Sequence, residues 1–108
     1  MVNVVFNKKN CNLVSVKMNG HAESVDDGYD MVCSAISSVS QTILIGILEV
    51  LKLKATYSLN DGFLSFSLEE LPDKDVKQCQ VLMETMLLGL KSIEIGYGEY
   101  INIKVEEV

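Results

Sequence analysis

The sequence contains one histidine, His21, and a cysteine, Cys33, follows it twelve residues later. A cysteine and a histidine that meet in a fold can act as a pair in acyl chemistry, because the imidazole accepts and returns the proton of the thiol. We expect Cys33 to lie in the first turn of a long helix. The free amides there would stabilise a thiolate, and also the oxyanion formed when it attacks an acyl group. These residues define a candidate thiol site.

Neighbouring polar residues could support this pair. Ser37 lies one helical turn after Cys33 and shares its face, so its hydroxyl could donate a hydrogen bond or orient a bound peptide. Three carboxylates, Asp26, Asp27 and Asp30, are close enough in sequence to orient the imidazole. We choose Asp30 among them, although a role as helix N-cap explains that residue by itself. A two-residue dyad is equally acceptable.

Structural explanations of the same residues stay open. Cysteine is among the most buried residue types, and a lone histidine in a loop is often only solvated. Cys79 falls on the apolar face of the second predicted helix, and Cys11 lies between a turn and a strand. Neither needs a chemical role. Cys33 differs because it lies beside the apolar stripe of its helix, level with Ser37.

The sequence lacks the residue patterns of a metal site and of a phosphate-binding site. One histidine and three widely spaced cysteines do not show the paired spacing of zinc ligands, so we expect no metal. A phosphate-binding glycine motif is absent, since Gly96-Tyr97-Gly98 precedes a strand rather than a helix. We therefore expect no cofactor.

The first half of the chain predicts a hairpin, a loop and a helix. Apolar residues alternate over residues 2–6 and 14–18, which predicts two strands joined by a turn at residues 7–10. Residues 19–29, rich in glycine and acidic residues, predict an exposed loop. A helix should run from Asp30 as N-cap to about Leu51. Its expected core-facing stripe is Val32, Ala35, Ile36, Val39, Ile43, Ile47 and Val50.

The second half repeats this order. Alternation over residues 53–59 and 64–68 around Asn60-Asp61-Gly62 predicts a second hairpin. Pro72 and Asp73 begin a second helix, glycines at positions 96 and 98 end it, and residues 101–105 form a last strand. Its expected apolar face is Val76, Cys79, Leu82, Met83, Met86, Leu87 and Leu90. The order β-β-α-β-β-α-β predicts an α+β domain, with two helices covering one face of an antiparallel or mixed sheet.

Length and charge narrow the class of protein. The 108 residues fit one domain spanning 1–108. A net charge of -6 argues against broad nucleic-acid binding and favours basic partners. No signal-like segment opens the chain, and serines and threonines make the uncharged run Met31–Leu48 too polar for an unassisted membrane span. An odd number of cysteines argues against a disulfide framework. We expect a soluble, cytoplasmic protein.

Together, the residues Gly20-His21-Ala22, a short loop ending at Gly28, and the run Asp30-Met31-Val32-Cys33-Ser34-Ala35-Ile36-Ser37 resemble the ribosomal-processing cysteine protease family, Prp. Gly-His-Ala followed by Asp-x-Val-Cys-x-Ala-x-Ser at this spacing is specific, and the resemblance covers essentially the whole chain. Met31 stands where isoleucine is usual and Ser34 where alanine is usual. Neither change removes a group that the mechanism needs.

This resemblance implies an activity, a substrate and a set of site residues. Cys33 would be the nucleophile and His21 the general base and acid. The supporting or substrate-binding positions would be Gly20, Ala22, Gly28, Asp30 and Ser37. The family removes a short N-terminal extension from a large-subunit ribosomal protein, number twenty-seven, by cleavage after an aromatic pair. Its members are homodimers, and the loop from Ala22 to Tyr29 would close over the peptide.

Two functions of other classes stay open. A small acidic domain could bind the same basic ribosomal protein as a non-catalytic assembly factor, and it would then tolerate Cys33→Ser. A thiol-based redox or acyl-transfer enzyme would not release two peptides.

Overall fold

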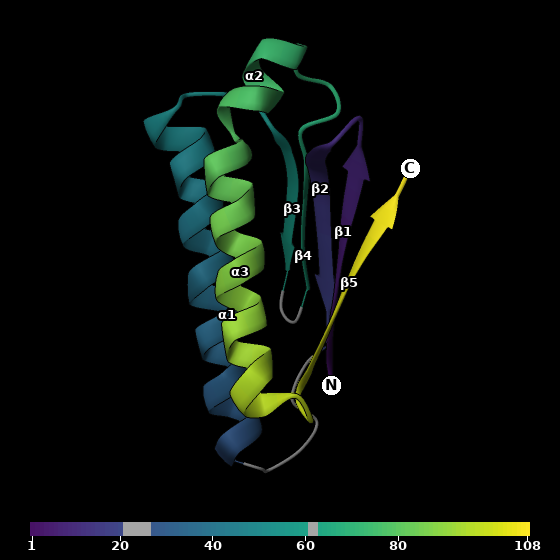
Figure 1. Ribbon diagram of the computed structural model, residues 1–108. Coiled ribbons are helices and arrows are strands. Elements are labelled where there is room, and N and C mark those ends of the chain that lie inside the picture. Colours follow the sequence, from purple (N-terminus) through teal and green to yellow (C-terminus); the bar gives the residue numbers. More distant parts are fainter. Residues whose placement is uncertain (21–26, 61–62) are drawn as a thin grey trace.

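A computed structural model describes residues 1–20, 27–60 and 63–108, with residues 27–30 described by their backbone alone. In these ranges five strands form one mixed sheet, and two long helices lie side by side over one of its faces (Figure 1). The strands are β1 (Val2–Lys9), β2 (Asn12–Asn19), β3 (Thr56–Asn60), β4 (Phe63–Ser67) and β5 (Ile101–Glu107). The helical elements are α1 (Asp27–Ile45), the π-helical η1 (Gly46–Val50), α2 (Asp73–Gln78) and α3 (Gln80–Tyr97). The predicted α+β class is confirmed.

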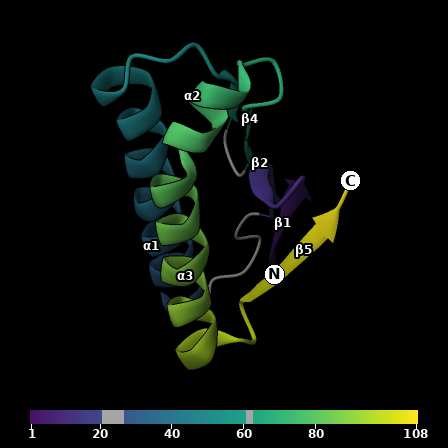
Figure 2. The ribbon, with the colours of Figure 1, turned by 45° about the horizontal axis from the view of Figure 1, so that its top comes forward.

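The sheet has the order β3-β4-β2-β1-β5, with β5 parallel to β1 and the other pairs antiparallel. Figure 2 shows both long helices on the same side of the sheet and β5 at its far edge. The predicted opening hairpin is confirmed, but its turn is shorter than predicted. Strand β1 continues to Lys9, and Asn10 and Cys11 turn the chain with φ of 51° and 68°. Two successive residues with left-handed backbone conformation match the twist of the two strands. A two-residue turn is therefore sufficient to join them.

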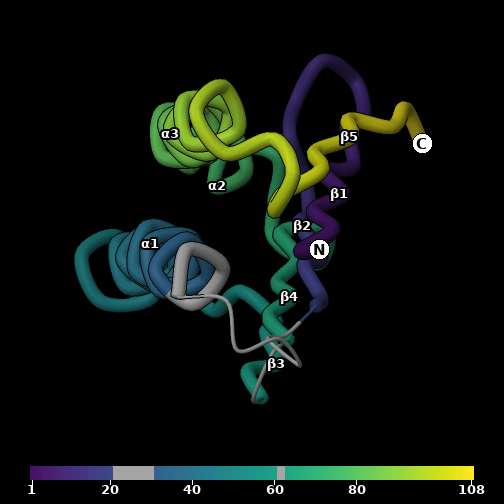
Figure 3. Tube along the Cα trace, turned by 90° about the horizontal axis from the view of Figure 1, so that it is seen from below, coloured from purple at the N-terminus to yellow at the C-terminus, as the bar shows by residue number. Residues whose placement is uncertain are grey.

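The predicted second hairpin is also confirmed, because β3 and β4 pair antiparallel. Asp61 and Gly62 of its expected turn lie outside the described residues. The apolar residues of β3 alternate with polar ones, but their side chains are not buried. Tyr57 is 54% exposed and Leu59 is 48% exposed, because β3 is the edge strand and lies beyond the layer of helices (Figure 3).

Helix α1 begins at Asp27, three residues before the predicted start. Asp30 therefore lies inside the helix, and its predicted N-cap role is wrong. Gly28 and Tyr29 are helical as well, so the predicted loop is too long at this end. Acidic residues are favourable throughout the first turn of a helix, so the acidic side chains near this point do not single out one start. The predicted end near Leu51 is confirmed, with Leu51 following the last helical residue, Val50.

The buried stripe of α1 differs from the predicted one at a few positions. Ala35 and Val50 are exposed, whereas Ser40 and Leu44 are buried. The Ser40 hydroxyl donates a hydrogen bond of 2.7 Å to the carbonyl of Ile36. Burial of this polar group is tolerated because the hydroxyl has a partner within its own helix.

By length and composition, the stretch Met31–Val50 is apolar enough to cross a membrane. The expectation that its serines and threonines exclude a span by composition is therefore wrong. The structure gives another reason for this apolarity, since Val32, Ile36, Ile43 and Ile47 are buried in the core. The core helix of a soluble domain has the same composition.

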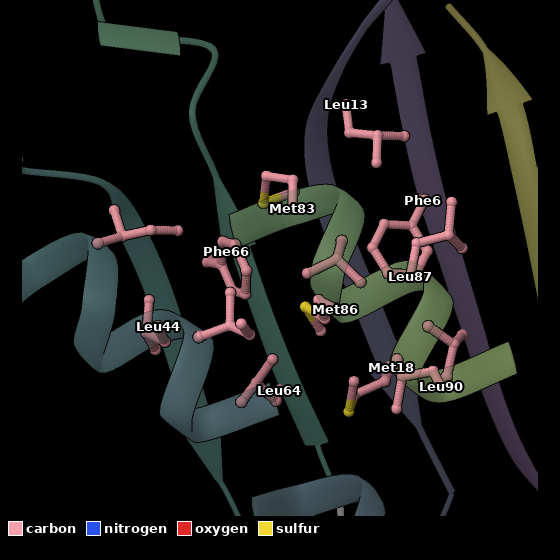
Figure 4. Close-up of a cluster of buried hydrophobic side chains, with 14 of the residues drawn as sticks. Phe6, Leu13, Met18, Leu44, Leu64, Phe66, Met83, Met86, Leu87 and Leu90 are labelled. Atoms are coloured by element: carbon pink, nitrogen blue, oxygen red, sulfur yellow. The ribbon is translucent and has the colours of Figure 1, made fainter. Parts of the chain in front are cut away.

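The second helical segment begins at Asp73 after Pro72, as predicted, and is divided at Cys79 into α2 and α3. Gly96 lies in the last turn of α3 instead of ending it, and Gly98 follows Tyr97 as the C-cap. The predicted apolar face is confirmed, with Leu82 only partly buried. Its methionines and leucines pack against strand residues such as Phe6, Met18, Leu64 and Phe66 (Figure 4).

Gln80 joins the start of α3 to the start of β2. Its carboxamide oxygen accepts a hydrogen bond of 2.8 Å from the amide of Leu13, and its Nε2 donates one of 2.9 Å to the carbonyl of Leu13. Leu13 lies beside an irregularity in the β1–β2 register, between Asn7 and Lys8. Gln80 therefore bonds the amide and carbonyl of Leu13, next to the point where the regular pairing of β1 and β2 is interrupted. These bonds also hold the start of α3 on the sheet.

Replacement of Gln80 should destabilise the fold. Gln80→Ala removes both hydrogen bonds to Leu13 and should lower the free energy of unfolding by about 1–3 kcal/mol. Chemical denaturation monitored by circular dichroism measures this change. Gln78→Ala is the matched control, because Gln78 is exposed near the end of α2, and it should change stability far less. Equal effects of the two substitutions would contradict this role of Gln80.

Candidate active site

Cys33 is the seventh residue of α1, so it lies in the second helical turn. The prediction that it lies in the first turn is wrong, because the helix begins at Asp27. The unbonded amides of a helix belong to its first four residues, and the effect of the dipole weakens beyond the first turn. The free amides at the start of α1 therefore lie about one helical turn before Cys33.

One flank of α1 carries Cys33 and the other faces α3. Val39 lies next to Gly89 of α3, and Gly46 lies next to Leu82. At about 100° per residue, Cys33 and Ser37 fall on the opposite flank of the helix from Val39 and Gly46. This flank faces away from α3, toward the part of the sheet that contains β4 and β3 (Figure 3).

On this flank Cys33 is half-buried and packs at the margin of the core, while Ser37 is exposed. The Ser37 Oγ accepts a hydrogen bond of 3.1 Å from the Gln41 Nε2. The hydroxyl hydrogen of Ser37 therefore remains able to point toward a ligand. The sequence motif includes Ser37 but not Gln41, although Gln41 follows Ser37 by one helical turn and so lies on the same flank.

Gly20 directly follows the last residue of β2 and has a conformation that requires glycine. Its φ is +125°, and a Cβ at this position would lie 2.9 Å from the Cα of Val2 and closer still to the carbonyl oxygen of Met1. The end of β2 therefore passes against the start of β1 without room for a side chain. Figure 1 shows this end of β2 at the same end of the molecule as the beginning of α1.

The described residues place only part of the predicted site. Cys33 and Ser37 share one flank of α1, and Gly20 lies at the end of the neighbouring strand β2. Gly28 and Asp30 are placed by their backbone in the first turn of α1. His21, Ala22 and most of the predicted mobile loop lie outside the described residues.

The other two thiols have different surroundings. Cys11 is exposed in the β1–β2 turn, and Cys79 is buried between α2 and α3. Burial raises the pKa of the Cys79 thiol, and the negative charge of Asp75 raises it further. Cys79 is therefore held as an inert, protonated thiol. Cys33 is the thiol that combines partial exposure with a neighbouring hydroxyl.

Among the side chains of residues 1–20, 31–60 and 63–108, no three of histidine, cysteine or acidic type gather as metal ligands. A half-exposed thiol thus lies on one flank of α1, and Gly20, just after β2, precedes the single histidine of the sequence. A family model described as cysteine protease Prp matches residues 1–102. The chain belongs to the Prp family of cysteine proteases.

Individual relatives agree with this family. The chain is 28% identical over 91 residues to the ribosomal processing cysteine protease Prp of Staphylococcus aureus, covering 84% of this chain and 85% of the relative. It is 24% identical over 94 residues to the Prp of Bacillus subtilis, with 84% of each chain covered.

Solved structures share the fold. A crystal structure of a Streptococcus mutans protein has a TM-score of 0.90 and 25% identity, covering 100% of this chain and 96% of that one. The S. aureus Prp with a covalently linked product peptide has a TM-score of 0.82 and 25% identity, covering 98% and 100%.

Substitution of Gly20 should destabilise the protein. In Gly20→Ala the new Cβ would meet the backbone of Met1 and Val2 at an unfavourable φ, which should lower the free energy of unfolding by about 1–3 kcal/mol. Gly96→Ala is the control in the same chain, because nothing lies within 4 Å of a Cβ there. It should raise helix stability by about 0.5–1 kcal/mol. Thermal unfolding compares the two, and changes of the same sign would refute the steric argument.

Proposed function

We propose that this enzyme removes the short N-terminal extension of large-subunit ribosomal protein number twenty-seven during ribosome assembly in the cytoplasm. Cleavage follows an aromatic pair, with Cys33 as nucleophile and His21 as general base and acid. The motif from Gly20 to Ser37 supports this proposal, as does the naming of the relatives as ribosomal processing proteases. An S. aureus relative has been solved with a covalently linked product peptide, and a covalent link to a peptide is what nucleophilic catalysis predicts.

The position of Cys33 is the observation that carries the proposal. Its thiol lies at the margin of the core, half-buried, on the flank of α1 that α3 leaves uncovered. A nucleophile must be held rigidly and still be reached by a carbonyl carbon. Packing against the core satisfies the first requirement, and the uncovered flank satisfies the second.

The proposed reaction has two stages. The Cys33 thiol passes its proton to His21, and its sulfur forms a bond to the carbonyl carbon of the second residue of the aromatic pair. Collapse of the tetrahedral adduct breaks the C–N bond, and His21 gives the proton to the leaving amine. A water molecule, deprotonated by His21, then attacks the thioester and releases the carboxylate product and the thiol. Ser37, exposed on the thiol flank, would donate a hydrogen bond to the peptide.

The charge of the chain fits a basic substrate. Glu23, Asp26, Asp27 and Asp30 lie between His21 and Cys33 in sequence, and this interval contains no lysine or arginine. A basic segment beside the cleaved bond would be attracted to such a region. The attraction raises the rate of encounter and does not take part in the bond-breaking step.

Peptide cleavage tests the proposal. A synthetic peptide carrying the extension and its junction should be cut once, after the aromatic pair, as read by mass spectrometry. Cys33→Ser should lower kcat/KM about a thousandfold or more, and His21→Ala about 100- to 10,000-fold. Cys11→Ser is the matched control, because Cys11 is an exposed thiol in the β1–β2 turn, and its activity should equal that of wild type.

The outcomes separate the proposed function from its rival. Wild-type protein that binds the peptide without cutting it, with Cys33→Ser binding equally well, would identify a non-catalytic assembly factor. A modified thiol without two product peptides would identify redox or acyl-transfer chemistry instead.

We also propose that the enzyme is a homodimer paired through the outer helical face. This face consists of Met31, Ser38 and Ile45 on α1 and Val81, Leu88 and Ile95 on α3. The five apolar members are between 55% and 89% exposed. Each set recurs every seven residues, opposite the buried stripe of its helix, as at a helix–helix interface.

The two helices align these residues in layers. Because α1 and α3 run in opposite directions (Figure 1), Met31 and Ile95 lie toward one end of the face and Ile45 and Val81 toward the other. The face contains no charged residue along these rows. A second copy offers the same apolar rows, and so provides a self-complementary partner in a symmetric dimer.

A charge on this face should separate the subunits. Leu88→Glu would bury an unpaired carboxylate at the centre of the interface and weaken dimerisation about tenfold or more. Sedimentation equilibrium over a range of concentrations measures the change. Val105→Glu is the control, because Val105 is an exposed apolar residue on β5 and does not belong to the outer helical face. A wild-type monomer at all concentrations would refute the dimer, and an unchanged dimer in Leu88→Glu would place its interface elsewhere.

A further inference from the structure

The two edges of the sheet differ in their protection against added strands. Strand β5 carries Lys104, Glu106 and Glu107, which discourage another strand from pairing there. Strand β3 reads Thr-Tyr-Ser-Leu-Asn, without charge or proline, and each of its residues is exposed. An uncharged, exposed edge is a template for pairing with another extended chain. Strand β3 is therefore the edge that is open to a partner.

The hydrogen-bond register shows which backbone groups of β3 are free. The amide of Leu68 donates a hydrogen bond of 2.7 Å to the carbonyl of Val14, so Leu68 points its backbone groups toward β2. Along β4 this direction alternates, so Ser67, Ser65 and Phe63 point theirs toward β3. Their partners on β3 are Thr56, Ser58 and Asn60. The amides and carbonyls of the residues between them, Tyr57 and Leu59, therefore point outward from the sheet.

The same two residues turn their side chains toward the helices. Tyr57 lies opposite the buried Phe66 and Leu59 opposite the buried Leu64, and opposed residues share a face of the sheet. Their side chains therefore project on the helix side while remaining about half exposed. Helix α1, whose Cys33 flank is not covered by α3, lies on this side of the sheet (Figure 3).

We infer that the substrate peptide binds as an added strand along β3, with its backbone paired to Tyr57 and Leu59 and its apolar side chains packed on theirs. This inference rests on the proposed function and specifies how the peptide is held. Strand β3 ends at Asn60, and Figure 1 shows this end of the hairpin nearer to the beginning of α1 than its other end is. An extended peptide on β3 can thus continue toward the thiol. An aromatic side chain of the peptide would make apolar contacts with Tyr57 and Leu59.

Strand addition requires free backbone hydrogen-bonding groups at every second residue of the substrate peptide. Alternate residues of the peptide donate and accept backbone hydrogen bonds with β3, and the residues between them point their amides to solvent. Methylation of single backbone nitrogens should therefore raise KM at alternate positions, by about three- to tenfold. Methylation at the intervening positions should change KM less than twofold.

Substitutions on β3 test the side chains. Tyr57→Ala and Leu59→Ala should each raise KM about tenfold, through loss of apolar contact, with little change in kcat. Val105→Ala is the matched control, since Val105 is a half-exposed apolar residue at the other edge of the same face and should leave KM unchanged. Leu59→Pro also removes an outward amide without breaking the ladder to β4, so its KM should exceed that of Leu59→Ala. Circular dichroism verifies that each variant is folded.

Failure of this inference is distinguishable from failure of the proposed function. If wild type cuts the peptide but the Tyr57 and Leu59 variants keep its KM, and N-methylation shows no alternation, the peptide binds elsewhere and the inference is wrong. If these variants lose the dimer while keeping KM, the edge belongs to a second copy, and the inference is again wrong. If no peptide is cut by wild type, anisotropy with labelled peptide still decides, because weaker binding to Tyr57→Ala than to Val105→Ala supports the added strand.

Discussion

Helix α1 packs on the core and on α3. This packing fixes the rotation of the helix about its own axis, and the rest of the site depends on that rotation. The inner stripe of α1 and of its continuation η1, including Ile36 and Ile47, is buried in the core, and the side with Val39 and Gly46 lies against α3. Each buried aliphatic side chain contributes about 1.5–3 kcal/mol to the stability of the fold. Rotation of the helix would expose several of these side chains at once and lose their contributions. The flank that carries Cys33 is therefore held in one orientation by the packing of the other residues of its helix.

The second support of the site is the close passage of the end of β2 against β1. Gly20 has no space for a Cβ there, and the next residue is the single histidine. Strand β1 lies between β2 and β5 in the sheet, so the strand that leads to His21 is anchored through a central element. In this arrangement, residues far from the thiol, such as Gln80, act on the site only by holding the helical layer in place.

The sequence predicted what depends on local periodicity. Both hairpins, the apolar face of α2 and α3, and the end of the first helical segment at Val50 were predicted correctly, because strand and helix periods are visible in the order of residue types. The first residue of α1 was not, because Asp26, Asp27 and Asp30 all suit a helix start. Burial of Ser40 could not be predicted either, since it depends on a hydrogen bond within the helix that the residue type permits but does not require.

The exposure of Tyr57 and Leu59 was also beyond local reasoning. Their alternation with polar residues is typical of a strand with one buried face. Whether that face is covered depends on the strand order, and this order follows from the parallel pairing of β1 with β5 at the other side of the sheet. Of the candidate site, the motif located the thiol and its hydroxyl neighbour. It did not predict Gln41, or the flank on which the thiol lies, which requires the position of α3.

An uncovered flank on α1 and an unprotected edge on β3 together favour one kind of substrate. A chain that pairs with β3 must be extended and must have its own backbone groups free over several residues. Segments inside a folded protein rarely meet both conditions, because their amides and carbonyls are already bonded. A terminal extension meets them without unfolding anything. Selectivity of this kind comes from the geometry of the sheet edge, and it would restrict a thiol protease to chain ends even where the amino-acid preference of its site is modest.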